Sequence, residues 1–521
     1  MSTVRNVLFI MCDQLRADHL SCYGHRVLQT PNIDALAARG VRFERTYVSS
    51  PICGPSRMSF YTGRSVMSHG ATWNRVPLSL RELTLSDYLA RAGRRAVLAG
   101  KTHVLPDSRG FERFGIELES ERGVLLREGG FVPIDRYDGH SPPGSESGYA
   151  GYLRSRGYLS KDPWTDFVIA TEDERGKTYS GWQMRNVHLP ARVKEEDSET
   201  AYMMRKAIDF IRERGNDSWV LHLSLVKPHW PYVAPAPYHA LFKPRDMLPV
   251  RRAAIERERP HPVYGAFQQH EWCRSFARDE VIERVRPVYM GLVKQVDDHI
   301  GRLVEALGQL GRFEDTLIIF TSDHGEFGGD HWLGEKELFY EQAARVPLIL
   351  VDPDPRAHAT RGTSERRFIE AIDVVPTILD SLGVPGASHL IEGRSLLPLV
   401  RSGDVAGWRD MAVSEVDYAF NEARRILGRR PGECRGWMVR TDRWKYVHWQ
   451  GFRPQLFNLE DDPDEFIDLG EDARHESVRR EMRERLLQWM SERKQRTTLS
   501  DVEVEARTNS AAKHGIYIGV W

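Results

Sequence analysis

Apolar runs alternate with amphipathic stretches along the first two thirds of the chain, from Val7 to about Leu350. Five of the apolar runs are predicted strands: residues 7–11, 96–99, 219–224, 316–321 and 346–351. Strands that are separated by helices need crossover connections, and crossovers join parallel strands. The pattern therefore predicts an α/β fold with a large, mostly parallel sheet flanked by helices.

Four segments between the strands have helical periodicity, and each ends at or near a glycine that suits a left-handed helix cap. They are residues 32–39, 84–91, 198–214 and roughly 284–307. Residues 119–192 have weaker periodicity and many glycines, charges and aromatic rings, which indicates an insertion that shapes a substrate pocket. Its Tyr149, Tyr152, Trp164 and Trp182 are candidates for a pocket wall, although ordinary packing would explain any one of them.

The pattern changes after a helix that begins near residue 372. Residues 437–440, 444–449 and 455–459 are short predicted strands joined by tight turns, and a polar helix follows at 477 to about 494. A chain of 521 residues also exceeds what one hydrophobic core usually holds. We therefore expect a catalytic domain at 1–392 and a smaller antiparallel α+β domain at 393–521.

Composition excludes some classes of partner. Lysine plus arginine (73) nearly balance aspartate plus glutamate (74), so nothing suggests nucleic acid or an anionic membrane. No apolar stretch reaches the length of a membrane span, and the first apolar run is too short for a signal peptide. We expect a soluble, cytoplasmic protein. The five cysteines lack C-x-x-C spacing, which argues against a disulfide framework and a structural zinc site.

Polar residues gather directly after the predicted strands, where ligands bind in open α/β sheets. Any one of them has an ordinary explanation as a turn residue or a surface histidine, but together they predict a site. Two carboxylates among them would hold one divalent cation. The collected residues are Asp13, Gln14, Lys101, His103, His229, Asp323 and His324.

A second motif is Cys53-Gly54-Pro55-Ser56-Arg57, followed by Thr62-Gly63-Arg64. Pro55 suits the first turn of a helix, which places Cys53 at the positive end of the helix dipole. Arg57, in the same turn, is suited to a sulfate or phosphate group. The alternative is a helix that merely begins with a buried cysteine.

The motif resembles the signature of the formylglycine-dependent (type I) sulfatases of the alkaline phosphatase superfamily, although Tyr61 replaces the usual leucine. The resemblance covers nearly the whole chain and implies an alkaline phosphatase-like fold. It implies that a formylglycine-generating enzyme oxidises Cys53 to formylglycine, an aldehyde whose hydrate carries two hydroxyl groups. It also implies a metal site made of Asp13, Gln14, Cys53, Asp323 and His324.

Two departures indicate the subgroup. Many sulfatases carry Asp-Asp and Asp-Asn where this chain has Asp13-Gln14 and Asp323-His324, a set that resembles the choline-sulfatase, arylsulfatase and phosphonate monoester hydrolase branch. Calcium is the expected metal, with manganese the alternative because a histidine ligand makes the site softer. The element Gly100-Lys101-Thr102-His103 favours sulfate over phosphonate.

The resemblance implies hydrolysis of a sulfate monoester, R-O-SO3, to R-OH and sulfate. One hydroxyl at position 53 would attack sulfur, His229 would protonate the leaving oxygen, and His103 would deprotonate the second hydroxyl to expel sulfate. The implied catalytic residues are Cys53, Arg57, Lys101, His103, His229 and Lys336, and the substrate-binding residues are Lys101, His229, Lys336 and Asn74.

Two other functions stay open: a phosphonate monoester or phosphate diester hydrolase with the same site, and an anion-binding protein in which Cys53 is never oxidised. The apolar end at residues 516–521 predicts a homo-oligomer in which this tail covers a neighbouring subunit, although it could also fold back on its own sheet.

Overall fold

The computed structural model describes residues 4–139, 144, 147–403, 405–508 and 510–515. The apolar end at residues 516–521 lies outside these ranges, so the expectation that it covers a neighbouring subunit stays a prediction. Among the described helices, none combines the length and the apolar character that crossing a membrane requires.

The main sheet has nine strands within the described residues, in the order β10-β2-β9-β8-β1-β7-β3-β4, with β11 paired to β2. Neighbours of β1 run parallel to it, whereas β9 is antiparallel to both β8 and β2. The expected α/β fold with a large, mostly parallel sheet is confirmed. The strands are β1 Asn6–Asp13, β2 Val41–Tyr47, β3 Ala96–Gly100, β4 Val132–Arg136, β7 Val220–Pro228, β8 Thr316–Ser322, β9 Arg345–Val351, β10 Thr363–Glu365 and β11 Ile369–Glu370.

The five predicted strands are β1, β3, β7, β8 and β9, which form the unbroken centre of the sheet. Central strands are buried on both faces and therefore read as continuous apolar runs. The strands that the pattern did not reveal lie towards the two edges. There β2 mixes charged with apolar residues and β4 contains Pro133, which is tolerated at a sheet edge.

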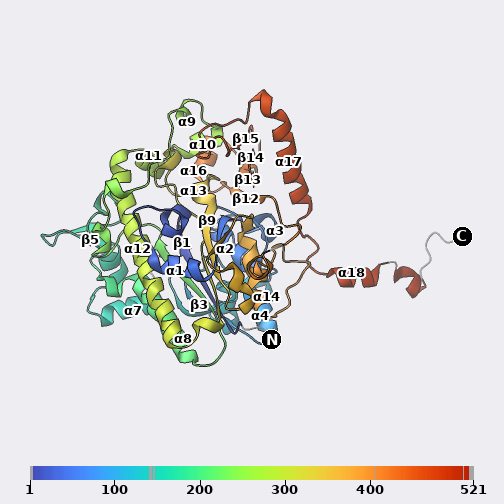
Figure 1. Cartoon of the computed structure of the whole chain (residues 1–521), viewed down its shortest axis with the longest axis horizontal. Coiled ribbons are helices and arrows are strands. Elements are labelled where there is room, and N and C mark those ends of the chain that lie inside the picture. The colour runs from blue at the N-terminus through green and yellow to red at the C-terminus, as the bar shows by residue number, and fades with distance from the viewer. Residues whose placement is uncertain (1–3, 140–143, 145–146, 404, 509, 516–521) are drawn as a thin grey trace.

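Helices cover both faces of the sheet (Figure 1). The side chains of β1 alternate between the two cores: Leu8 and Ile10 pack in one, Val7 and Phe9 in the other. The first core contains residues of α1 (Pro31–Arg39), α8 (Glu199–Arg214) and α12 (Asp279–Gln309). The second contains residues of α2 (Cys53–Thr62), α4 (Leu85–Arg91) and α14 (Val374–Ser381).

All four predicted helices are present, but α12 begins earlier than expected. It carries Pro287 in its interior rather than in its first turn. A proline in a helical pattern usually marks the first turn or a break, so local rules placed the start too late.

The C-terminal part is an antiparallel sheet, as expected. Its strands are β12 Ala412–Asp417, β13 Arg435–Arg440, β14 Trp444–Trp449 and β15 Gln455–Asn458. Helix α17 (Glu476–Ser491) packs on it through Met482 and Leu486. The change of architecture falls between α15 (Leu397–Arg401) and β12.

Residues 119–192 are tied into the main body. They supply the edge strand β4, a helix α7 (Gly148–Ser155) and a small sheet of β5 (Ala170–Glu172) and β6 (Thr178–Ser180). Two of the proposed wall residues, Tyr149 and Trp164, are buried in the core, whereas Trp182 is 45% exposed.

Candidate active site

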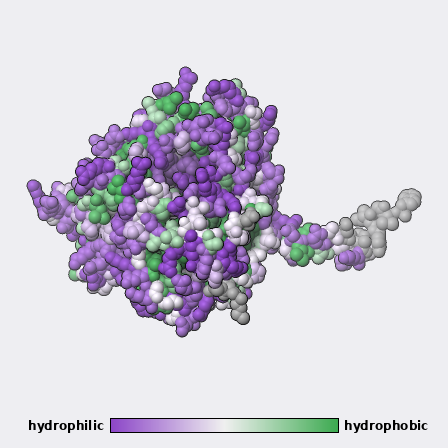
Figure 2. Space-filling model, in the orientation of Figure 1, coloured by the Kyte–Doolittle hydropathy of each residue, from purple (hydrophilic) through white to green (hydrophobic). Residues whose placement is uncertain are grey.

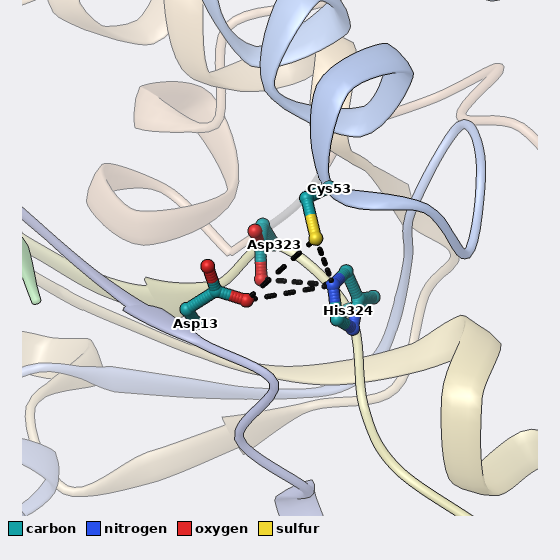
Figure 3. A group of neighbouring side chains, drawn as sticks. All are labelled: Asp13, Cys53, Asp323 and His324. Carbon is teal, nitrogen blue, oxygen red and sulfur yellow. Dashed lines mark hydrogen bonds and ion pairs between the residues drawn. The ribbon is translucent and has the colours of Figure 1, made fainter. Parts of the chain in front are cut away.

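Residues from three separate segments meet at the carboxyl ends of β1 and β8. Asp13 ends β1, Asp323 and His324 follow β8, and Cys53 begins α2. Because β1 and β8 are hydrogen-bonded neighbours, the two aspartates lie side by side. One ligand atom from each of the four side chains lies within 4.8 Å of all the others, and all four are buried (Figure 3).

The imidazole of His324 is oriented for use as a ligand. Its Nδ1 donates to the Gly325 carbonyl at 2.8 Å, so Nε2 carries the free lone pair. That Nε2 lies 3.0 Å from Cys53 Sγ and 3.5 Å from Asp13 Oδ1. Burial lowers the pKa of His324, which keeps the ring neutral. Two carboxylates and a neutral imidazole are a donor set that fits one divalent metal ion.

The start of α2 fixes the place of Cys53. The Gly54 N–H donates to Asn74 Oδ1 at 2.7 Å, which satisfies one of the free amides of the first turn. A Cβ at position 54 would lie 2.9 Å from that same oxygen, so the close approach requires glycine. In this structure Asn74, a predicted substrate-binding residue, thus holds the helix that presents Cys53.

Arg57 and Lys101 pair with the two aspartates and balance their charge. Arg57 is fully buried and donates to Asp323 Oδ2 at 2.7 Å, to Ser224 Oγ and to the Lys101 carbonyl. Lys101 Nζ forms an ion pair with Asp13 Oδ2. Burial alone would raise the pKa of Asp13, but Lys101, His229 and Arg57 hold it well below its usual range. The hydrogen bonds of Arg57 go to protein groups, so in this structure it holds the carboxylates in place.

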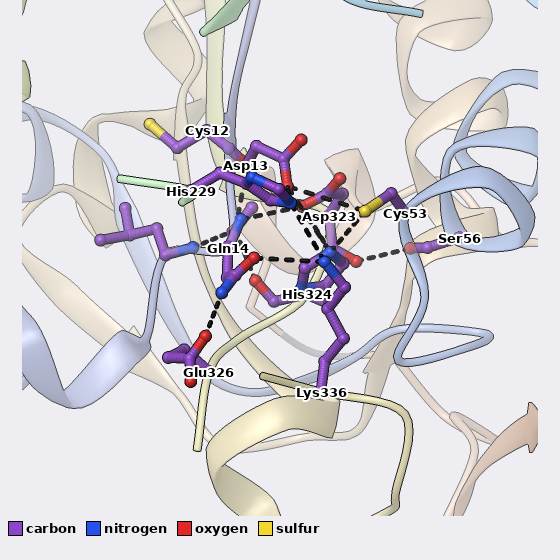
Figure 4. A network of polar contacts seen from close by, with 12 residues as sticks. Cys12, Asp13, Gln14, Cys53, Ser56, His229, Asp323, His324, Glu326 and Lys336 are labelled. Carbon is purple, nitrogen blue, oxygen red and sulfur yellow. Dashed lines mark hydrogen bonds and ion pairs between the residues drawn. The ribbon is translucent and has the colours of Figure 1, made fainter. Parts of the chain in front are cut away.

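Two further side chains, His229 and Lys336, lie beside the cluster (Figure 4). Lys336 Nζ lies 3.1 Å from His229 Nε2 and 3.2 Å from Gln14 Oε1. His229 Nδ1 lies 2.6 Å from the Trp230 carbonyl, which can only accept, so Nδ1 carries the hydrogen and Nε2 faces the site. Burial opposes the charge of Lys336, but Cys53, Glu335 and Asp13 together raise its pKa.

Glu326 was not among the predicted site residues, yet it orients Gln14. The Gln14 amide nitrogen donates to Glu326 and to the Tyr232 hydroxyl, which turns Gln14 Oε1 towards Lys336. Gln14 itself has a left-handed backbone, with φ at 69°. Burial and the neighbouring Glu335 raise the pKa of Glu326 to about 7. The sequence signal was its place two residues after His324, but its burial depends on the fold.

Lys336 sits in a loop with unusual backbone geometry. Positive φ angles occur at His331, Trp332, Glu335 and Glu337, none of which is a glycine. Such conformations cost free energy and persist where the surroundings enforce them, often at functional sites. His103, the remaining predicted residue, follows β3 two positions after Lys101, is half-buried and also has a positive φ, at 57°.

Comparisons with known proteins agree with this arrangement. Residues 5–384 match the family described as Sulfatase, and residues 329–492 match the family described as N-sulphoglucosamine sulphohydrolase, C-terminal. The chain is 33% identical over 519 residues to the multifunctional alkaline phosphatase superfamily protein PehA of Trinickia caryophylli, covering 95% of this chain and 97% of that one. It is 27% identical to an arylsulfatase of Clostridium perfringens, covering 89% and 90%.

Among solved structures, the chain resembles the phosphonate monoester hydrolase of Agrobacterium radiobacter. The TM-score is 0.80 at 31% identity, and the match covers 94% of this chain and 96% of that one.

Proposed function

Because this chain belongs to the sulfatase family, we propose that it hydrolyses a sulfate monoester to R-OH and inorganic sulfate at the site around Cys53. The observation that carries this proposal is the position of Cys53: it begins a buried helix and lies within one ligand shell of Asp13, Asp323 and His324. Hydrolysis of 4-nitrophenyl sulfate by the metal-replete protein, and its loss in Cys53→Ala, tests the proposal.

The nucleophile in this proposal is formylglycine at position 53, made by a formylglycine-generating enzyme. Burial, together with the charge of Asp13, raises the pKa of the Cys53 thiol to about 11, so the surrounding side chains do not activate it as a thiolate. The C-x-P-S-R motif gives the same indication. Mass spectrometry of the peptide that contains residue 53 decides the point, because only unmodified cysteine in fully active protein would contradict it.

One divalent metal would be held by Asp13, Asp323, His324 and residue 53, with Gln14 beside them. When bound, such an ion polarises oxygen atoms in its coordination shell. We propose calcium as the metal, with manganese as the alternative because His324 supplies nitrogen.

The chain's own residues supply positive charge and a proton. Lys336 lies beside Gln14 and His229 and would bind the sulfuryl oxygens. The family resemblance assigns Lys101 the same role, and in this structure Lys101 also pairs with Asp13. His229 Nε2 lies beside Lys336, and when the ring is protonated it is the nitrogen able to give a proton to the leaving oxygen, since Nδ1 is committed to Trp230. We assign His103 the removal of a proton at position 53 on the strength of the family resemblance.

A second candidate is hydrolysis of phosphonate monoesters or phosphate diesters. The structural similarity to a phosphonate monoester hydrolase favours it, as do Gln14 and His324. The ratio of kcat/KM for 4-nitrophenyl sulfate and for 4-nitrophenyl phenylphosphonate separates the two, and we expect sulfate to be preferred because Lys101 and His103 are present.

We also propose that the protein is a homo-oligomer. Helix α18 (Asp501–Arg507) stands away from the body (Figures 1 and 2), and its Val502 is 79% exposed. An isolated helix this short is marginal in water, so it needs a partner surface. In a homo-oligomer, a second copy of the chain provides this partner surface.

A further inference from the structure

Three tryptophans form a continuous aromatic path from the core to the candidate active site. Trp164 is buried and packs on Trp182 with ring centroids 6.2 Å apart. Trp182 is 45% exposed and lies 5.7 Å from Trp230, whose ring is 4.5 Å from that of His229. Lys336 Nζ is 5.9 Å from the centre of the Trp230 ring. The end of this path nearest to solvent consists of the exposed Trp182 and the half-buried Trp230, and it is called the indole wall below.

The indole wall is held in place by close backbone packing. Gly181 donates its N–H to the Ile169 carbonyl at 2.8 Å, and a Cβ at position 181 would lie 2.2 Å from Val233. The Ala191 N–H also donates to the Ala234 carbonyl at 2.9 Å. The segment that carries Trp182 is therefore fixed against the segment 229–234, which carries His229 and Trp230.

We propose that the indole wall binds an aromatic leaving group, so that the preferred substrates are aryl esters. The inference rests on the proposed function, in which His229 protonates the leaving oxygen. A leaving group attached to that oxygen lies next to the ring that touches His229, and Trp182 extends the same surface towards solvent. Aromatic rings pair favourably with indoles beyond the area that they bury.

The charge beside the wall favours a neutral ring over a cationic group. Indoles also attract quaternary ammonium groups. However, the ammonium group of Lys336 already lies near Trp230, and the negative charges of Glu335 and Asp13 favour its charged form although it is buried. A cationic leaving group such as choline would be repelled by Lys336, whereas a phenol would not.

Binding to the full-length, metal-replete Cys53→Ala protein separates recognition from turnover. Isothermal titration with phenyl sulfate and with cyclohexyl sulfate compares an aromatic with an aliphatic ring of similar size. We expect phenyl sulfate to bind roughly three- to tenfold more tightly, because that ratio corresponds to the binding free energy of one aromatic pair. Adding Trp182→Ala should remove this difference, whereas Trp182→Phe should keep most of it. Trp272→Ala, which changes another exposed tryptophan, should have no effect.

Any of four results would overturn the proposed binding role of the indole wall. They are equal binding of the two esters, no measurable binding of either, tighter binding of choline sulfate than of phenyl sulfate, and an unchanged affinity ratio in Trp182→Ala. Failure of the proposed function is distinguishable: the mature enzyme would then cleave phenyl phenylphosphonate but not phenyl sulfate. In that case phenyl sulfate would still bind more tightly than cyclohexyl sulfate, and Trp182→Ala would still remove the difference.

Discussion

At the scale of single residues, the two aspartates of the site have separate supports. Asp323 Oδ1 accepts the Gln14 N–H at 3.1 Å and its Oδ2 accepts from Arg57, whereas Asp13 pairs with Lys101. Each carboxylate therefore keeps a fixed orientation before any ligand arrives, which is the preorganisation that a metal site needs.

The first prediction concerns Asp323. Asp323→Asn removes one negative charge and turns an amide N–H2 towards donors, so metal affinity and rate should fall together. Replacing residues that only support ligands costs 10- to 100-fold, so losing a ligand should cost roughly 100-fold or more. Metal content by mass spectrometry, measured beside kcat, checks this. The matched control is Asp352→Asn, a buried aspartate paired with Arg401, which should keep its metal. An active, metal-free Asp323→Asn protein would refute the site.

The second prediction explains Tyr61, which replaces the usual leucine of the signature. A leucine could only pack at this position, whereas the Tyr61 hydroxyl lies 3.0 Å from His222 Nε2. His222 Nδ1 lies 3.1 Å from the Phe9 carbonyl and carries the hydrogen, so Nε2 must accept. Tyr61→Phe leaves a buried acceptor unpaired and should lower the free energy of unfolding by about 1–3 kcal/mol.

Urea unfolding measures that loss. The double variant Tyr61→Phe/His222→Phe should cost less than the sum of the single variants, because the two changes remove one shared hydrogen bond. Strict additivity would show that the hydroxyl makes no such bond.

At the scale of elements, Glu415 joins β12 to helix α3 (Val66–His69). Its carboxylate is buried and accepts the Met67 N–H at 2.9 Å and the Trp437 Nε1–H at 3.2 Å. Burial outweighs these bonds and raises the pKa of Glu415 from 4.5 to about 7. The link between the two parts of the chain is therefore sensitive to pH.

The third prediction follows from that shift. Between pH 4.5 and about 7 the folded protein binds more protons at Glu415 than the unfolded chain does, so this group makes stability fall as pH rises through that window. The loss is up to about 3 kcal/mol. Glu415→Gln stays neutral and should gain stability relative to the wild type on going from pH 5 to pH 8. Urea unfolding at both values measures the difference, and the exposed Glu422→Gln should behave as the wild type. Parallel pH profiles for the wild type and Glu415→Gln would contradict the assignment.

At the scale of the whole molecule, the fourth prediction concerns assembly. If α18 and the residues beyond it cover another subunit, the full chain should be a dimer or larger by light scattering. A chain that ends at Ser500 lacks α18 and should form a smaller oligomer. A chain that ends at Thr508 keeps α18 and removes only the residues beyond it, so it tests the tail separately. A monomeric full chain, or masses unchanged by both truncations, would remove this region from the interface.

The sequence by itself determined the centre of the fold and pointed to the polar residues that lie at the ends of its strands. The five central strands are buried on both faces, so each appears in the sequence as an uninterrupted apolar run that a polar residue ends. These strands are β1, β3, β7, β8 and β9. The motif at Cys53 is also local, because it specifies a helix start. These features need no knowledge of distant contacts.

Only the tertiary structure decided how the site residues are used. Asn74 was predicted to bind substrate and Arg57 to act in catalysis, and the structure adds a positioning contact for each: Asn74 accepts from Gly54 and Arg57 donates to Asp323. Glu326 was not predicted because its role depends on a contact with Gln14, which is more than 300 positions away. The indole wall likewise needs Trp182 and Trp230 to meet across two segments. Periodicity records which face of an element is buried, whereas the partner of each polar group is set by packing between segments far apart in the chain.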